Sequence, residues 1–587
     1  MARNFGDLFE HAADVFGDRI ALVSGDRQVT YAQFEERANR LAHHLSGIGV
    51  APGDHVGLYA HNSVEAAETI VAACKIRAVA ININYRYTEN ELRYMFADAD
   101  LAALVCDRRY APRAAAAAAP GLRGTVVIED GSGADTGPAA GYDAALAAAS
   151  PARDFGPRSE DDVYIIYTGG TTGYPKGVMW RHEDIWCTLG GGIDFLTGEP
   201  LADEWEQSRK GLQGGGLVRL TAAPLIHGAA QVAMLAALFA GDTVVLAPRF
   251  DAREVWLAVQ RHKVNLLFII GDAMGRPLVE AYHEGGYDAS SLFAVSSSGA
   301  LFSPVVKDAF AAALPNVVIS DAIGSTETGF AGLAAVTPGA PQRGGPTVAP
   351  GPEVIVLDEL GRPAPPGQIG RLARGGHVPL GYYKDPGRTA TMLAEVDGTR
   401  YAVPGDLARL EADGSVTLLG RGATCVNTGG EKVFPEEVES ALKSCPDVFD
   451  ALVIGIPDDL LGQRVAALVQ LREGRAAELP AIEGQVRDRI AGYKVPRSIW
   501  LVDAISRSAA GKADYHWAHR HAASHPADLG PPADPGPPAD LGQPSRATAP
   551  QAPGRTPDKA PPAPLRRPGA EDQPPEASEA PAREADG

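Results

Sequence analysis

The chain has 587 residues, of which 45% are hydrophobic and 21% are charged, and its formal net charge is −20 at pH 7. This length exceeds what a single hydrophobic core supports, so we expect more than one domain. The negative charge would repel nucleic acid and anionic membranes, which excludes a bulk electrostatic role at either of them.

No targeting or membrane-spanning segment is expected from the sequence. The N-terminus lacks the apolar run of a signal peptide, and no stretch reaches the ~18 apolar residues of a transmembrane helix. The five cysteines show neither C-x-x-C spacing nor neighbouring histidines, so we interpret them as reduced rather than as a disulfide or zinc site. These features favour a cytoplasmic protein.

Helix-like and strand-like segments alternate through the first half of the chain, which predicts an α/β fold. The expected helices cover Phe5–Phe16, Tyr31–Ile48, Ser63–Cys74, Ala230–Phe239 and Glu254–His262. The expected strands cover Ile20–Ser24, Val29–Tyr31, His55–Tyr59, Thr221–Pro224, Thr243–Leu246 and Leu266–Ile270.

The pattern changes near residue 420 and again near residue 521. Ala451–Ile456 and Val465–Leu471 resemble strands and Ile482–Ala491 resembles a helix, so a smaller α+β unit is expected up to about residue 520. The remaining Pro/Ala-rich segment, with three near-copies of a Pro-Ala-Asp repeat, lacks the apolar area that offsets ordering entropy. We therefore predict domains at 1–420 and 421–520 and a disordered tail at 521–587, in which a docking role for the repeats is the alternative to an inert extension.

A loop rich in glycine and threonine follows the apolar strand that ends at Tyr167. Its glycines allow the backbone N–H groups to approach an anion, its threonines add hydroxyl donors, and its lysine adds a positive charge. A Walker motif needs Gly-Lys followed by Ser or Thr, whereas this loop has Pro175-Lys176-Gly177, so it is not a Walker motif. The residues expected to bind a polyphosphate are Thr168, Gly169, Gly170, Thr171, Thr172, Gly173 and Lys176.

This loop resembles the phosphate loop of the adenylate-forming superfamily, which comprises acyl-CoA synthetases, peptide-synthetase adenylation domains and luciferases. Further segments that resemble the superfamily's motifs follow in order, so that the resemblance covers about residues 5–520. They are Pro224–Gly228, Ser297–Leu301, Asp321–Thr328, Tyr401–Leu407, Leu419–Arg421, Val426–Glu439 and Ile505–Lys512. The resemblance implies a large N-terminal domain of α/β layers and a small, mobile α+β C-terminal domain.

The resemblance also implies a site for ATP and Mg²⁺. Lys512 is the expected catalytic lysine, Glu327 the expected Mg²⁺ ligand, and His227 an expected residue of the acyl pocket. Asp406 is expected to accept hydrogen bonds from the ribose hydroxyls, and Arg421 to lie near the ribose and the α-phosphate. Further ATP contacts are expected at Gly299, Ala300, Asp321, Ser325 and Thr326.

Two further expectations concern coenzyme A and the motion of the small domain. Gly429, Gly430 and Lys432 are candidates for the CoA tunnel. Gly422 and Ala423 are the candidate hinge, although many members of the superfamily have Asp or Lys at the position of Ala423.

The expected function is an ATP-dependent acyl-CoA synthetase that works through an acyl-adenylate. Its expected partners are a small-molecule carboxylic acid, ATP and CoA, with no nucleic acid. The segment Met179–Trp186 resembles actinobacterial synthetases for long-chain fatty acids and steroid side-chain carboxylates. The alternatives are a ligase that loads a carrier protein, a luciferase-like oxygenase and a non-catalytic binding paralogue.

Overall fold

The computed structural model describes residues 3–529 except 119, 169–174, 189–191, 194–199, 301, 337–344, 352, 429–430, 459–460, 477 and 508–510. Residues 530–587, which make up most of the predicted tail, lie outside the described residues. Among the helices of the described ranges, none combines the length and hydropathy that a membrane crossing requires.

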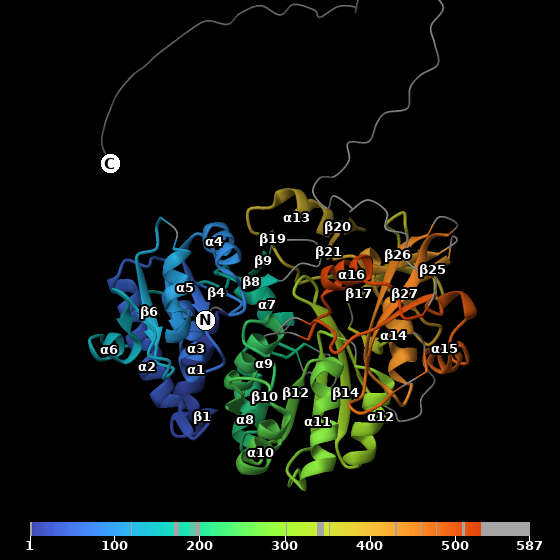
Figure 1. Cartoon of the computed structure of the whole chain (residues 1–587). Coiled ribbons are helices and arrows are strands. Elements are labelled where there is room, and N and C mark those ends of the chain that lie inside the picture. Colours follow the sequence, from blue (N-terminus) through green and yellow to red (C-terminus); the bar gives the residue numbers. More distant parts are fainter. Residues whose placement is uncertain are drawn as a thin grey trace, which may run out of the picture. The chain divides into compact units, whose positions relative to one another are not determined.

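The main sheet contains parallel strands in the order β1, β11, β10, β12, β13 and β14, and the antiparallel strand β2 (Arg27–Thr30) flanks β1. Figure 1 labels β1, β10, β12 and β14 of this run. The strands are β1 Ile20–Ser24, β11 Thr243–Leu246, β10 Val218–Thr221, β12 Leu266–Ile269, β13 Ala294–Ser298 and β14 Val318–Ser325. The helices that connect them include α9 Gly228–Phe239, α10 Ala252–His262, α11 Gly271–Gly285 and α12 Pro304–Ala313. Parallel strands joined by helices confirm the predicted α/β class.

The first elements show why the sequence patterns were informative. Helix α1 (Phe5–Phe16) has the predicted bounds, and the side chain of Asn4 caps its first turn. The predicted strand over 29–31 is shifted, because β2 is Arg27–Thr30. Thr30 and Gln33 form a capping box, and this box starts α2 (Tyr31–Gly47) at the residue where the strand was expected to end.

Two smaller sheets lie in the same domain. One is parallel, with strand order β4, β3, β5, β6 and β7, and the other is antiparallel, with order β19, β9 and β8. Their strands are β3 His55–Tyr59, β4 Val79–Asn82, β5 Leu101–Asp107, β6 Gly124–Ile128, β7 Ala140–Gly141, β8 Val163–Thr168, β9 Lys176–Arg181 and β19 Gly381–Tyr382. Helices α3 Val64–Lys75, α4 Glu89–Asp98, α5 Ala111–Ala116, α6 Tyr142–Ala147 and α7 His182–Thr188 belong to the same region.

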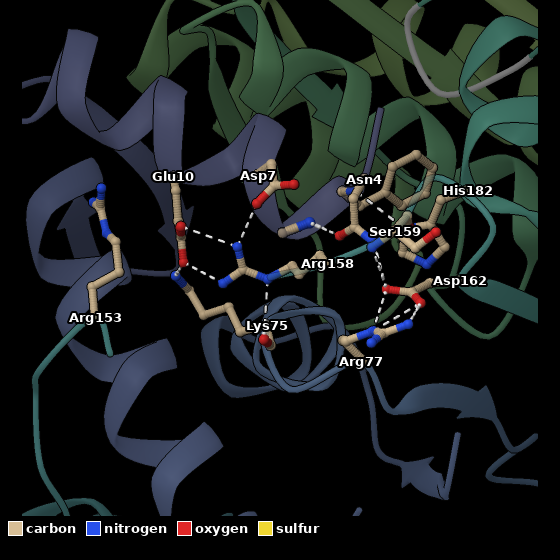
Figure 2. A network of polar contacts seen from close by, with 12 residues as sticks. Asn4, Asp7, Glu10, Lys75, Arg77, Arg153, Arg158, Ser159, Asp162 and His182 are labelled. Carbon is tan, nitrogen blue, oxygen red and sulfur yellow. Dashed lines mark hydrogen bonds and ion pairs between the residues drawn. The ribbon is translucent and has the colours of Figure 1, made fainter. Parts of the chain in front are cut away.

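A polar network joins the segment before β8 to α1 and α3 (Figure 2). Arg158 forms an ion pair with Glu10 of α1 at 2.6 Å and donates to the carbonyl of Lys75 in α3 at 3.0 Å. Asp162, directly before β8, accepts from the guanidinium of Arg77 at 2.7 Å. These contacts fix the entry into β8 and therefore the start of the predicted phosphate loop.

An antiparallel region extends the main sheet beyond β14 in the order β15, β16, β23, β22, β18, β21 and β20, and β17 pairs with β18. Its strands are β15 Gly329–Ala335, β16 Thr347–Pro350, β17 Val354–Leu357, β18 Ile369–Gly375, β20 Leu393–Val396, β21 Thr399–Ala402, β22 Asp406–Leu410 and β23 Val416–Arg421. Helix α13 (Pro386–Met392) precedes β20.

The small C-terminal domain has its own sheet and its own core. Its strand order is β25, β24, β27 and β26, with β28 parallel to β27. Its elements are β24 Val426–Thr428, β25 Glu431–Val433, α14 Pro435–Lys443, β26 Val448–Asp458, β27 Gly462–Leu471, α15 Leu479–Arg487, β28 Ser498–Leu501 and α16 Tyr515–Ser524. A separate apolar cluster between α14, α15 and this sheet confirms the predicted small α+β domain.

The predicted start of the tail at residue 521 needs correction, because residues 521–529 pack on the small domain. The indole of the buried Trp500 donates to the carbonyl of His525 at 3.0 Å. The amides of Ile499 and Leu529 each donate to the other residue's carbonyl, at 3.0 and 3.1 Å. Composition alone missed this docking, because the partners belong to β28 and not to the segment itself.

Truncation separates the docked residues from the rest of the predicted tail. Ending the chain after residue 529 should leave the melting temperature within error. Ending it after residue 520 removes several hydrogen bonds worth about 1 kcal/mol each, so we expect a fall of roughly 5 °C. Thermal unfolding of the two truncated chains and the full chain measures both effects. Equal melting temperatures of all three would contradict the docking of residues 521–529.

Candidate functional site

Predicted site residues gather where parallel strands of the main sheet end. His227 follows β10, Gly299 follows β13, and Glu327 follows β14. Neighbouring parallel strands present their carboxyl ends at the same edge, which is where such sheets bind ligands. The fold therefore brings together segments that are far apart in the sequence.

A tight turn between β14 and β15 presents Glu327. The amide of Ser325 donates to Thr328 Oγ1 at 3.0 Å, and the amide of Thr328 donates to Ser325 Oγ at 3.1 Å. The buried indole of Trp180 donates to the carbonyl of Thr326 at 2.9 Å. These bonds fix the backbone on both sides of the Glu327 carboxylate.

Tyr382 links Glu327 to the predicted phosphate loop. Its hydroxyl donates to Glu327 Oε1 at 3.0 Å, and Lys176 Nζ lies 5.5 Å from the centre of its ring. Lys176 begins β9 opposite Thr168, the last residue of β8, so these two residues border the loop. The other predicted loop residues, Gly169, Gly170, Thr171, Thr172 and Gly173, lie outside the described residues.

A buried asparagine holds the entry of this loop beside His227. Asn82 Nδ2 donates to the carbonyl of Tyr167 at 2.8 Å and to the carbonyl of Ile226 at 2.6 Å. The amide of Tyr167 donates back to Asn82 Oδ1 at 2.8 Å. Sequence reasoning missed Asn82, whose only signal is a polar residue at the end of an otherwise apolar strand.

His227 is a neutral, partly buried side chain at the site. Burial and the nearby charges of Lys512 and Arg86 together lower the pKa of His227 to about 3. Its Nε2 is buried and has no hydrogen-bond partner among the described residues. Because buried polar atoms normally have partners, this nitrogen is suited to a ligand. A neutral imidazole at physiological pH positions a ligand but does not protonate it.

The low pKa of His227 makes folding sensitive to acid. An unfolded histidine binds a proton below a pH of about 6.5, whereas folded His227 stays neutral down to about pH 3. The unfolded state therefore gains protons first, and stability falls as the pH falls through this window. Through this histidine, the free energy of unfolding of the wild type should be about 2 kcal/mol lower at pH 5 than at pH 7.5, and His227→Gln should not show this loss. Melting temperatures of wild type and variant at pH 7.5 and pH 5 measure this. If the variant and the wild type differ in melting temperature by the same amount at both pH values, the prediction is contradicted.

The segment before Lys512 packs against the carboxyl end of β12. Gly511 has a φ of +69°, and a Cβ added there would lie 2.8 Å from Ala273 Cβ and 3.7 Å from the carbonyl oxygen of Ile270. Glycine is therefore required by both conformation and space. Gly511 therefore holds the residue before Lys512 at the carboxyl end of β12, and the charge of Lys512 contributes to the lowered pKa of His227.

The predicted adenine-facing residues have different surroundings. Gly299 has a φ of +79°, and Ala300 packs partly buried against the main core. Asp321 lies on β14 with its carboxylate buried and ion-paired to Lys307. Burial raises the pKa of Asp321, and Lys307 opposes this increase. Asp321 is thus held by a protein partner, whereas Gly299 and Ala300 border the ligand edge.

Asp406 and Arg421, the predicted ribose pair, are register partners in neighbouring strands. Asp406 begins β22, and Arg421 ends β23 directly opposite. Gly420, which precedes Arg421 in β23 and lies opposite Leu407, has a φ of +111°, and a Cβ added there would overlap the Glu436 carboxylate. A larger residue at 420 is excluded, so the backbone beside Arg421 is closely confined.

The predicted hinge residues Gly422 and Ala423 lie in a 3₁₀ turn, Gly422–Thr424, directly after β23. In this structure the left-handed backbone belongs to Gly420 and not to Gly422. Of the predicted CoA residues, Lys432 lies in β25 opposite Asn427, and Gly429 and Gly430 lie outside the described residues.

A cavity of about 740 Å³ lies between the large domain and the small domain. His61 stacks on Tyr85 and on Tyr110, with ring centres 4.3 and 5.5 Å apart. The arginines that line the cavity are Arg86, Arg113, Arg249, Arg276 and Arg507. Stacked rings beside several guanidinium groups suit an aromatic ligand that carries phosphates. Sequence reasoning missed this site because its residues come from many separate segments.

Two family models match the chain. The model of the AMP-binding enzymes matches residues 9–383, and the model of the AMP-binding enzyme C-terminal domain matches residues 437–512.

The most similar relatives cover nearly the whole described chain. A 3-oxocholest-4-en-26-oate–CoA ligase from Rhodococcus rhodochrous is 53% identical over 90% of this chain and 97% of its own length. A medium/long-chain-fatty-acid–CoA/3-oxocholest-4-en-26-oate–CoA ligase from Mycobacterium tuberculosis is 51% identical over 90% of this chain and 98% of its own length. The crystal structure of ATP-bound MatB from Rhodopseudomonas palustris matches with a TM-score of 0.74 and 26% identity, over 89% of this chain and 99% of that one.

Proposed function

Because the chain belongs to the family of AMP-binding enzymes, we propose that it is an AMP-forming acid–CoA ligase, which converts a carboxylic acid first to its acyl-adenylate and then to its acyl-CoA. The observation that carries the proposal is the position of Gly511 against Ile270 and Ala273, which brings Lys512 to the edge that holds His227 and Glu327. A non-catalytic paralogue that only binds a ligand would not require a lysine at this edge.

The proposed substrates are medium-chain and long-chain fatty acids and the side-chain carboxylate of 3-oxocholest-4-en-26-oate. Relatives that carry these names are 51–53% identical to the chain over almost their full length. The neutral His227 suits such acids, because it offers one hydrogen-bonding nitrogen without adding a charge.

In the first half-reaction, a carboxylate oxygen of the acid attacks the α-phosphorus of ATP, and pyrophosphate leaves. We assign Lys512 the role of bridging the carboxylate and the α-phosphate, where its charge opposes the negative charge of the transition state. Lys176 and the loop after Thr168 would hold the departing phosphates, and Asp406 and Arg421 the ribose. The acid and ATP are both anionic, so positioned positive charge is the main requirement.

The residues present fit a Mg²⁺ ion that is shared with the nucleotide. The described residues contain no group of three or more His, Cys, Asp or Glu that forms a metal site from protein alone. Mg²⁺ typically takes one or two carboxylates together with substrate phosphates, and Glu327 provides one carboxylate beside the loop. When bound, the ion would offset charge on the phosphates.

In the second half-reaction, the thiol of CoA attacks the acyl carbonyl, and AMP leaves with its electron pair. We assign the nucleotide end of CoA to the cavity lined by His61, Tyr85, Tyr110 and arginines. Adenine would stack on the aromatic rings, and Arg86 and Arg249 would pair with its phosphates.

Replacing one cavity arginine should weaken CoA binding without affecting acid activation. We expect Arg249→Ala to raise KM for CoA about tenfold, the effect of one hydrogen bond to a charged group. Its ATP–pyrophosphate exchange should stay at the wild-type rate. Arg253→Ala is the matched control, because Arg253 pairs with Glu284 on the exposed surface. An unchanged KM for CoA in Arg249→Ala would place the nucleotide elsewhere.

The proposed function is tested by a panel of carboxylic acids with ATP, Mg²⁺ and CoA, followed by mass spectrometry. The expected products are acyl-CoA, AMP and pyrophosphate, with medium-chain or long-chain fatty acids or a steroid side-chain acid preferred over acetate. ADP and phosphate as products would overturn the adenylate mechanism. Transfer of the acyl group to a carrier protein but not to CoA would overturn the choice of acceptor.

A further inference from the structure

One face of helix α11 contacts the small domain through three polar residues spaced four positions apart. Asp272, Arg276 and Glu280 occupy successive turns, so they project from the same side of the helix. We call these three residues the α11 face. Glu280 forms an ion pair with Arg472, which follows β27, and the guanidinium of Arg276 lies 5.8 Å from the ring centre of Phe449 in β26.

Asp272, the remaining member of the α11 face, begins a chain of ion pairs that leads toward Lys512. Lys443 Nζ lies 3.5 Å from Asp272 Oδ2 and 3.3 Å from Asp450 Oδ1. Arg507 binds the Asp450 carboxylate with two nitrogens, at 2.7 and 2.8 Å.

Arg507 also fixes the backbone that precedes the catalytic lysine. Its Nη1 donates to the carbonyl of Gly511 at 3.0 Å. Arg507 and Ala513 form a β-bridge that closes this loop at its base. Ion pairs thus run from Asp272 of the large domain to Arg507. A hydrogen bond from Arg507 then reaches Gly511, the residue before Lys512.

Two residues of this ion-pair series are buried, so their contacts affect the position of the loop. Lys443 is 2% exposed and Asp272 is 8% exposed. Burial would raise the pKa of Asp450, but the charges of Lys443 and Arg507 hold it at about 2, so the carboxylate stays ionised. Separating the domains at this point exposes the partners to water, whereas removing one partner in the docked state leaves the other charge buried and unpaired.

We propose that the α11 face and the chain Asp272–Lys443–Asp450–Arg507 position the Lys512 loop for acid activation. They act through the loop, so they are positioning residues of the first half-reaction. Asp272, Asp450 and Arg507 also line the cavity proposed for CoA, whereas Lys443, which joins them, does not and therefore reports the positioning role alone. The inference rests on the proposed function, in which Lys512 serves only adenylate formation. Thioester formation does not need Lys512 beside His227, so it does not need these ion pairs.

The test measures the two half-reactions separately in Lys443→Met, because Lys443 does not line the cavity proposed for CoA. Acyl-adenylate formation, measured as acid-dependent ATP–pyrophosphate exchange, should fall about tenfold or more as a buried charge loses its partner. Acyl-CoA formation from supplied acyl-adenylate should stay within twofold of wild type. Glu284→Gln is the matched control on the same helix, because Glu284 pairs with exposed Arg253 and not with the small domain.

Exchanging the charges of a second, partly exposed ion pair keeps the test valid if a variant at a buried residue fails to fold. The Glu280–Arg472 pair is partly exposed, with 40% and 34% of the side chains accessible, so both can be replaced without burying a charge. Glu280→Arg and Arg472→Glu should each slow adenylate formation, and the double variant should recover most of the loss. Wild-type exchange in all variants, or equal loss in both half-reactions, would overturn the proposal. A wild-type enzyme that forms no acyl-CoA with any acid would instead refute the proposed function.

Discussion

Lys512→Ala should lower acyl-adenylate formation by about 10²–10³-fold, the scale on which a preorganised electrostatic donor acts. The loop that carries Lys512 is held from both sides: Gly511 packs on Ala273, and Arg507 binds the carbonyl of Gly511. In the proposed mechanism, its ammonium group would therefore reach the reacting carboxylate with little further loss of backbone freedom. Alanine removes the charge but leaves this backbone intact, so the loss should appear in the chemical step and not in folding.

Two measurements isolate the role of Lys512. ATP–pyrophosphate exchange with the acid reports the first half-reaction, and conversion of supplied acyl-adenylate with CoA reports the second, which should remain near the wild-type rate. Lys494→Ala is the matched control, because Lys494 is another lysine of the small domain and pairs only locally with Glu437. Equal losses in both half-reactions would refute the assignment of Lys512 to adenylation alone.

Local sequence signals predicted the elements whose ends are set by local chemistry. The start of α1 follows from the cap at Asn4, and the predicted and observed ranges of β11 (Thr243–Leu246) agree. The strand expected at 221–224 is instead β10, Val218–Thr221, because its ends are set by pairing with β11 and β12 on either side. Pairing of this kind is a long-range property that the segment's own residues do not encode.

The same distinction applies to the candidate site. The sequence motifs identified Glu327 and His227, and the fold places both at one edge of the main sheet. The residues that hold them there were not predicted, since Asn82 acts through carbonyls more than 80 positions away in the chain and Tyr382 through a single hydroxyl. Neither residue type is distinctive in sequence, and only the fold brings them to their partners.

The largest expected effect on the second half-reaction comes from the predicted hinge. Gly422–Thr424 forms a 3₁₀ turn in which the amide of Cys425 donates to the carbonyl of Gly422 at 3.3 Å. Proline fixes φ near −65°, a value typical of 3₁₀ turns, and the preceding glycine lacks the Cβ that would clash with the proline ring. Ala423→Pro should therefore be compatible with this docked pose, in which Gly511 lies on Ala273, but should oppose rotation away from it.

If Ala423 takes part in that rotation, the proline variant should complete the first half-reaction and stop. We expect a burst of pyrophosphate of about one per active site, accumulation of acyl-adenylate on the enzyme, and a fall in acyl-CoA formation by about 10²-fold or more, since a step that needs domain motion is blocked. Ala423→Ser is the matched control, because serine leaves φ free. Rapid-quench measurement of pyrophosphate and acyl-CoA in the same reaction gives both quantities. Wild-type acyl-CoA turnover in a folded Ala423→Pro variant would mean that the domain rotates about other residues, with Gly420 and its φ of +111° the next position to examine.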